Sequence, residues 1–163
     1  MNNHLPGKFL KRKLAELNSA LFFAEGDSLF KLPNHLITEM EMNDDGQIWF
    51  LVPKPAQDLE AFDKEFAVRL EFFKKGKPFR LKVQGKGAII EGTERDNLLA
   101  ESIAMQEKVK QEPVIMIKVT VQFVDYAGTM SDSFSGRLKM AGMQLSGWLF
   151  SSSSSAKSTV MGN

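Results

Sequence analysis

Cysteine is absent from this 163-residue chain, and histidine occurs only twice. Without cysteine, disulfides, zinc–thiolate sites, iron–sulfur clusters and thiol nucleophiles are excluded. His4 and His35 form no metal-ligand pattern with another His, Asp or Glu, and the sequence has no Gly-x-Ser-x-Gly elbow. The sequence therefore predicts neither a metal centre nor Ser-His-Asp catalysis.

Long apolar runs and a strong net charge are also missing. No window approaches the roughly 20 apolar residues of a membrane span. Residues 1–13 lack the apolar core of a secretory signal, so we predict a cytoplasmic protein. The formal net charge of +1 argues against nucleic acid as a partner. We interpret one basic cluster as solvated surface; it comprises Lys74, Lys75, Lys77, Arg80 and Lys82.

What is present is the composition of one ordinary globular domain, with 43% hydrophobic and 25% charged residues. A chain of this length buries roughly 70% of its unfolded surface, which is enough for a hydrophobic core without disulfides or a structural metal. Residues 1–127 are predicted to form the domain. Residues 128–163, which include a serine run, are predicted to be a partly flexible C-terminal appendage. Its apolar stripe leaves a role at a lipid surface open; the stripe comprises Leu138, Leu145, Trp148 and Leu149.

The clearest local signal in the sequence is a β-hairpin. Residues 36–42 alternate between apolar and polar, and Asn43-Asp44-Asp45-Gly46 favours a tight turn. Residues 47–52 are β-branched and aromatic, as a returning strand requires. This strand contains two adjacent aromatic residues, Trp49 and Phe50. Packing in the core explains them as well as a role in lining a groove or an interface does. The hairpin is thus predicted without any functional assumption.

The remaining segments predict a mainly β fold. Further strands are expected at residues 20–23, 68–73, 79–91 and 114–126, and helices at 8–18, 57–64 and 94–110. Gly85 and Gly87 lie within a strand pattern, where glycine marks a bend or bulge. The sequence therefore predicts a six-stranded antiparallel split β-barrel with flanking helices.

Four segments, in this order and spacing, carry a family resemblance. They are Asp-Gly-x-Ile-Trp-Phe-Leu in the hairpin, Ala-Val-Arg-Leu-Glu-Phe-Phe, Val-Gln-Gly-Lys-Gly and Ile-Met-Ile-Lys-Val-Thr. From about residue 19 to 128 the chain resembles the pyridoxamine 5′-phosphate oxidase-like split barrels, and within them the general stress protein 26 branch. The resemblance implies a homodimer with FMN at the subunit interface, and flavin-dependent oxidoreductase chemistry carried by the cofactor.

The resemblance also implies which residues bind the ring of the flavin, while it assigns no catalytic residue. Ile37 and Thr38 match the strand that lies beside the flavin. Phe50, Leu51 and Val52 match the strand end whose backbone meets the polar edge of the ring. These assignments place the ring between two neighbouring strands of the barrel.

Three further residues complete the implied site. Lys54 and Gln57 match the loop that binds the phosphate, and Gln84 matches a strand position that approaches the ring from the partner subunit. The chain has Asp58 where many relatives carry a basic residue. It has His35-Leu36-Ile37 where relatives typically carry Arg-Pro-Met. Loss of one charge-assisted hydrogen bond weakens phosphate binding about 10- to 100-fold. A non-enzymatic dimeric interaction module that has lost the flavin is therefore the alternative function.

Overall fold

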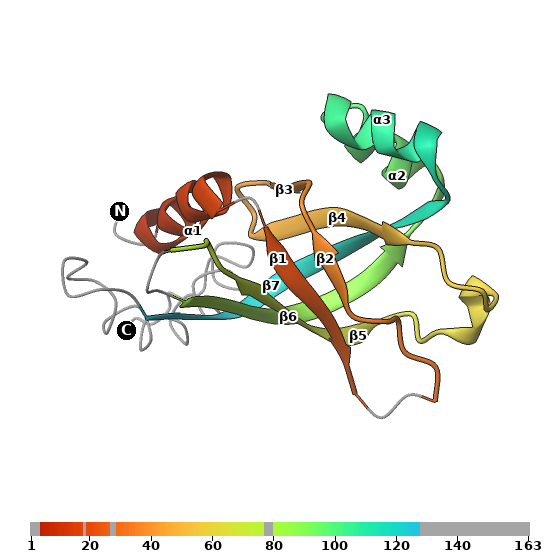
Figure 1. Ribbon diagram of the computed structural model, residues 1–163, viewed down its shortest axis with the longest axis horizontal. Coiled ribbons are helices and arrows are strands. Elements are labelled where there is room, and N and C mark those ends of the chain that lie inside the picture. The colour runs from red at the N-terminus through yellow and green to blue at the C-terminus, as the bar shows by residue number, and fades with distance from the viewer. Residues whose placement is uncertain (1–3, 18, 27–28, 77–79, 128–163) are drawn as a thin grey trace, which may run out of the picture.

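The computed structural model describes residues 4–17, 19–26, 29–76 and 80–127 (Figure 1). Its strands are β1 (Ala20–Glu25), β2 (His35–Ile37), β3 (Met40–Met42), β4 (Gln47–Pro53), β5 (Phe66–Phe72), β6 (Arg80–Ile90) and β7 (Val114–Ala127). Its helices are α1 (His4–Leu17), α2 (Gly92–Leu99), α3 (Ile103–Gln111) and the 3-10 helix η1 (Leu59–Ala61). The predicted appendage, residues 128–163, lies outside the described residues.

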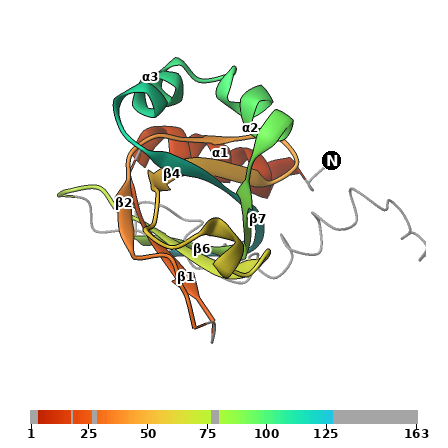
Figure 2. The ribbon, with the colours of Figure 1, turned by 90° about the vertical axis from the view of Figure 1, so that its right-hand side faces the viewer.

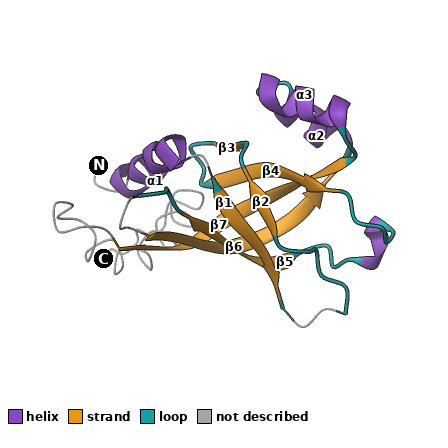
Figure 3. Ribbon diagram, in the orientation of Figure 1, coloured by secondary structure: helices purple, strands orange, loops and turns teal. Residues whose placement is uncertain are grey.

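The described strands form one antiparallel sheet in the order β2-β1-β5-β6-β7-β4-β3. β2 and β3 lie at opposite edges of this order, yet only Thr38 and Glu39 separate them in the chain. The chain itself therefore brings the two edges together, and the sheet curls into a half-closed barrel (Figures 2 and 3). This confirms the predicted mainly β, antiparallel split barrel. The prediction of a single strand over residues 36–42 is wrong, since β2 pairs with β1 and β3 with β4, which gives seven strands instead of six.

The core of the barrel is built from alternate residues of its strands. In β4, Ile48, Phe50 and Val52 belong to the main core, whereas Trp49 and Leu51 belong to a second apolar cluster. Successive side chains of a strand point to opposite faces. Because all five are buried, both faces of β4 are covered.

Helix α1 covers one end of the barrel (Figure 1). Phe9, Leu10, Leu14 and Leu17 are buried in the main core, at the helical spacing that predicted this helix. The ring of Phe9 meets that of Tyr126 edge-on, with centroids 5.2 Å apart. Full burial of a large apolar side chain contributes roughly 1.5–3 kcal/mol, so these four residues are the main attachment of α1.

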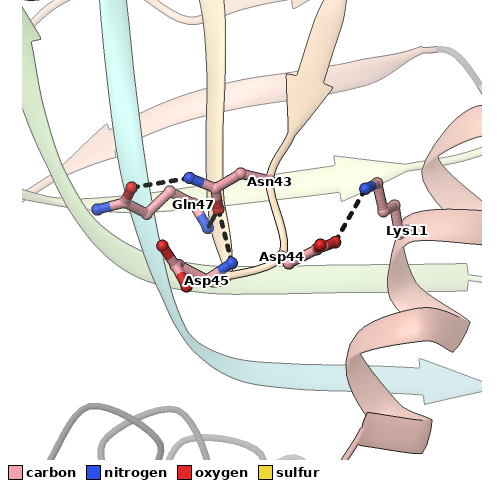
Figure 4. A network of polar contacts seen from close by, with 5 residues as sticks. All are labelled: Lys11, Asn43, Asp44, Asp45 and Gln47. Carbon is pink, nitrogen blue, oxygen red and sulfur yellow. Dashed lines mark hydrogen bonds and ion pairs between the residues drawn. The ribbon is translucent and has the colours of Figure 1, made fainter.

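The predicted hairpin turn between β3 and β4 is confirmed, and a side chain organises it (Figure 4). Asn43 Oδ1 accepts hydrogen bonds from the backbone N–H groups of Asp45 at 2.9 Å and Gln47 at 3.0 Å. Asn43 Nδ2 donates to Gln47 Oε1 at 3.0 Å. Lys11 of α1 forms an exposed ion pair with Asp44 at 3.0 Å. The turn therefore lies against the end of the barrel that α1 covers.

The prediction of one helix over residues 94–110 is wrong, because α2 and α3 are separate helices. The hydroxyl of Ser102 accepts a hydrogen bond from the backbone N–H of Met105 at 3.2 Å and so begins α3. Met105 is fully buried in the second apolar cluster, whose buried members are Trp49, Leu51, Ile90, Met105, Val114 and Met116. The predicted helix over residues 57–64 is likewise reduced to η1.

The pairing of β6 with β7 is irregular at Gly85, where the glycines of β6 predicted a bend or a bulge. The register shifts at this point, so that Gln84 pairs with Phe123 whereas Gly85 pairs with Val121. Strand β7 thus carries one extra residue, which is a β-bulge. A Cβ atom at Gly85 would lie 2.1 Å from the backbone oxygen of Thr120. Only glycine allows the two backbones to approach this closely.

Candidate functional site

The ends of β2 and β4 lie side by side and bring the predicted ring-binding residues together. The pairing of β3 with β4 ends where Met40 faces Phe50, and beyond it β4 pairs only with β7. Ile37 is the last residue of β2, and β2 contacts β4. If the register of β3 were continued by two residues, Thr38 would face Val52. Among the residues that the structure describes, this stretch of β4 has one backbone edge without a strand partner.

Most side chains at this strand end are unavailable to a ligand. Ile37, Phe50 and Val52 are buried in the main core, and Leu51 is buried in the second apolar cluster. The side chain of Thr38 is exposed. A ligand here would therefore meet the backbone of β4 and the hydroxyl of Thr38.

A pocket of about 190 Å³ lies next to the end of β4. Lys54, the residue after β4, lines it, and the backbone N–H of Lys54 donates to the carbonyl of Pro113 at 3.1 Å. Gln57 is exposed and is not part of the wall. Pockets for drug-sized ligands are about 300–1,000 Å³, so this pocket fits a small group better than a whole tricyclic ring. Its wall comprises Lys54, Leu59, Ile90, Glu91, Arg95, Val114 and Ile115.

The wall of this pocket contains two cations that are not neutralised. Within the described ranges, neither Lys54 nor Arg95 forms an ion pair. Arg95 Nε is buried and has no hydrogen-bond partner there. Glu94 pairs with Lys118 instead, so Glu91 is the only carboxylate of the wall. The pocket therefore favours an anion.

Arg95 is a site residue that sequence reasoning missed. It lies on α2, about 40 positions after Lys54, and no motif connects the two. Their proximity arises because Pro53 pairs with Val114 and Ile90 pairs with Met116, which aligns the end of β4, the start of β7 and the end of β6. The position of an arginine in the first turns of a predicted helix does not indicate that it lines a pocket together with a distant lysine.

Gln84 lies far from the other predicted residues of the same chain. It pairs with Arg69 on one side and with Phe123 on the other, on the outer face of the sheet. Ile90, which lines the pocket, is six residues further along β6, or about 20 Å at 3.3 Å per residue. Gln84 therefore cannot take part in the site of its own chain, and only a second copy could bring it there.

Two other kinds of site find no support in the part of the chain that the structure describes. None of its helices combines the length and apolar character that crossing a membrane requires. No three His, Asp or Glu side chains gather there into a possible metal site.

Comparison with known proteins yields matches among solved structures, while no family model and no curated protein matches the sequence. One match is a protein from Clostridium acetobutylicum related to general stress protein 26 of B. subtilis, of the pyridoxinephosphate oxidase family. It has a TM-score of 0.53 and 13% identity, over 76% of this chain and 91% of that chain.

Two further structures match over similar lengths. The general stress FMN/FAD binding protein from Xanthomonas citri has a TM-score of 0.50 and 16% identity, over 76% of this chain and 88% of its own. PhzG from Burkholderia lata 383, in complex with tetrahydrophenazine-1-carboxylic acid, has a TM-score of 0.53 and 14% identity, over 78% and 81%. Identities this low establish likeness of fold. The chain therefore has the split-barrel fold of the general stress protein 26 and pyridoxinephosphate oxidase proteins, as the order of its motifs predicted.

Proposed function

We propose that this chain binds FMN at the seam of a homodimer and acts as a flavin-dependent oxidoreductase of the general stress type. The observation that carries the proposal is the open backbone edge of β4 beyond Phe50, which lies between the exposed Thr38 and the cationic pocket at Lys54. A flavin presents a polar ring edge, which backbone groups can bind, and an anionic tail, which cations can bind. A protein of the same fold is described as FMN/FAD binding.

The residues at this strand end fit the two chemical parts of FMN. In this proposal the backbone of Leu51 and Val52 hydrogen-bonds the ring, beside the hydroxyl of Thr38. Lys54 binds the phosphate, and Gln57, which is exposed in the following loop, lies near it in the sequence. Bound flavin would supply the redox chemistry, while the protein orients the ring and excludes competing reactions. No side chain of the chain is assigned as acid or base.

A second copy of the chain would bind on the outer face that carries Gln84. On this face Phe123 is 45% exposed, Leu36 is 48% exposed and Leu21 is 36% exposed. Exposed apolar groups gathered on one face mark interaction sites. Because Gln84 pairs with Phe123, a dimer that buries this face takes Gln84 toward its partner. The proposed homodimer therefore supplies the residue that a single chain leaves about 20 Å from the pocket.

An absorbance spectrum before and after adding FMN tests the proposal, together with the mass of the particle by light scattering. We expect a yellow dimer that quenches FMN fluorescence at micromolar concentration. Phe123→Glu should give a monomer that has lost FMN, because the new charge cannot be buried at the seam. The matched control is Leu29→Glu, at a residue that is 89% exposed and lies outside the strands. A colourless protein that leaves FMN fluorescence unchanged would refute flavin binding.

A dimeric interaction module without flavin is the second candidate. The observation that favours it is Asp58, whose exposed carboxylate lies between Gln57 and the pocket residue Leu59. This charge repels a phosphate dianion. A dimer that binds no flavin would support the second candidate. The variant Asp58→Lys then shows how flavin binding was lost. Gain of FMN binding indicates a site weakened by one charge, and no gain indicates a site remodelled more widely.

A further inference from the structure

Arg95 brings a buried donor group without a protein partner to the wall of the pocket at the end of β4. Its Nε atom is buried, and within the described ranges it has neither a hydrogen-bond acceptor nor an ion-pair partner. Buried donors without a partner are rare in native proteins. The side chain as a whole is half-buried and lines the same pocket as Lys54, which follows β4. An anion in this pocket would give both cations a partner.

The start of α2 adds a second source of positive potential. Its N-cap is Glu91, whose side chain makes no capping hydrogen bond to the first turn. The first backbone N–H groups of a helix lack internal partners and carry the positive end of the helix dipole, so they favour anions. Gly92, the first residue of α2, has φ +69°, and a Cβ there would meet nothing within 4 Å. The backbone at the start of α2 is therefore accessible.

The negative charges near the pocket offset this potential only in part. Glu94 is engaged by Lys118 on β7. Asp58 is exposed and does not line the pocket. Glu91 remains as one carboxylate against two cations and the start of a helix.

We infer that this pocket binds a phosphate group, with Arg95 and Lys54 as its two cations. Its volume of about 190 Å³ suits a group as small as a phosphomonoester head better than a whole tricyclic ring. Arg95 thereby supplies the cation that the chain lacks at Asp58. The phosphate can come from free inorganic phosphate or from the tail of FMN. Only this choice of source rests on the proposed function, and the presence of the anion site does not.

Titration with inorganic phosphate, read as the rise in unfolding temperature, tests the site without flavin. Binding to the native state raises this temperature with ligand concentration. Arg95→Gln should weaken phosphate binding about 10- to 100-fold, the effect of losing one charge-assisted contact. The matched control is Arg80→Gln, at an exposed arginine on β6 outside the pocket, which should bind as the wild type does. Arg95→Lys keeps the charge and should recover part of the affinity.

An equal rise in the wild type, Arg95→Gln and Arg80→Gln would overturn the inference, because phosphate also stabilises proteins generally through its exclusion from their surface. No rise at millimolar phosphate in the wild type would overturn it as well. A second titration compares FMN with riboflavin, which lacks the phosphate. If FMN is the source, Arg95→Gln weakens FMN binding and leaves riboflavin binding unchanged. If neither flavin binds while phosphate binds through Arg95, the proposed function fails, the anion site stands, and its source is free phosphate.

Discussion

The two ends of the barrel contrast in what covers them. At one end, α1 buries four apolar side chains in the main core, and Leu10 is 1% exposed. At the other end, below α2, Lys54 and Arg95 line a pocket without ion-pair partners in the described parts of the chain. Figure 1 shows α1 and α2 at opposite ends of the sheet.

This contrast separates stability from function. At the α1 end, helical periodicity, burial and packing agree, which is the condition for a well-specified structure. At the α2 end, two like charges line one pocket, and a buried donor has no partner among the described residues, which costs stability. Proteins tolerate such local violations mainly at functional sites. We therefore expect substitutions at the first end to change stability and substitutions at the second to change binding.

Leu10→Ala should have the largest effect on stability. It removes most of a buried side chain and leaves a cavity under α1, so we expect a loss of about 2–5 kcal/mol in the free energy of unfolding. Urea denaturation followed by circular dichroism measures this loss. The control is Leu29→Ala, at a leucine that is 89% exposed, which should change the value by less than about 0.5 kcal/mol. Equal effects would mean that α1 does not seal the barrel.

Asn43→Ala should have an intermediate effect at the same end. The substitution removes the acceptor of two backbone N–H groups in the turn, each hydrogen bond contributing about 0.5–1.5 kcal/mol. We expect a loss of about 1–2 kcal/mol in the same denaturation experiment. Asp45→Ala keeps the backbone donor and should leave the stability near that of the wild type. A large loss for Asp45→Ala would show that its carboxylate, and not the turn bonded by Asn43, supports the hairpin.

The double substitution Lys54→Gln and Arg95→Gln should have the smallest effect on stability. Neither side chain has an ion-pair partner to lose among the described residues, so we expect a change within about 0.5 kcal/mol in urea denaturation. A small gain would reflect relief of repulsion between the two cations. A loss of more than about 1 kcal/mol would mean that these side chains hold α2 in place, and the contrast between the two ends would disappear.

Local patterns were enough to predict most of the fold. The hairpin at Asn43, the strand at β7 and the bulge at Gly85 depend on neighbouring residues, and the structure confirms them. Two breaks were not predicted. The alternation from Leu36 to Met42 runs unbroken through the sequence, and the strand divides because its two halves pair with different strands. Between α2 and α3 there is no glycine or proline, and the local signal for the break is Ser102, which caps the start of α3.

The candidate site was predictable only in part. The family resemblance named Lys54, which the structure places in the pocket, and Gln57, which lies outside its wall. Arg95 was missed because its approach to Lys54 depends on the pairing of β4 and β6 with β7, which no local pattern encodes. Gln84 differs from Lys54 and Arg95, because the role that the resemblance assigns to it depends on a second copy of the chain.

The brevity of β2 and β3 has a consequence for how copies of this chain meet. Each edge strand is three residues long, so each offers little free backbone to which a strand of another molecule could add. Growth of the sheet from one molecule to the next, the route to fibrils, is thereby disfavoured. Copies of this chain would therefore associate more readily through side chains on the outer face than by adding strands at these edges.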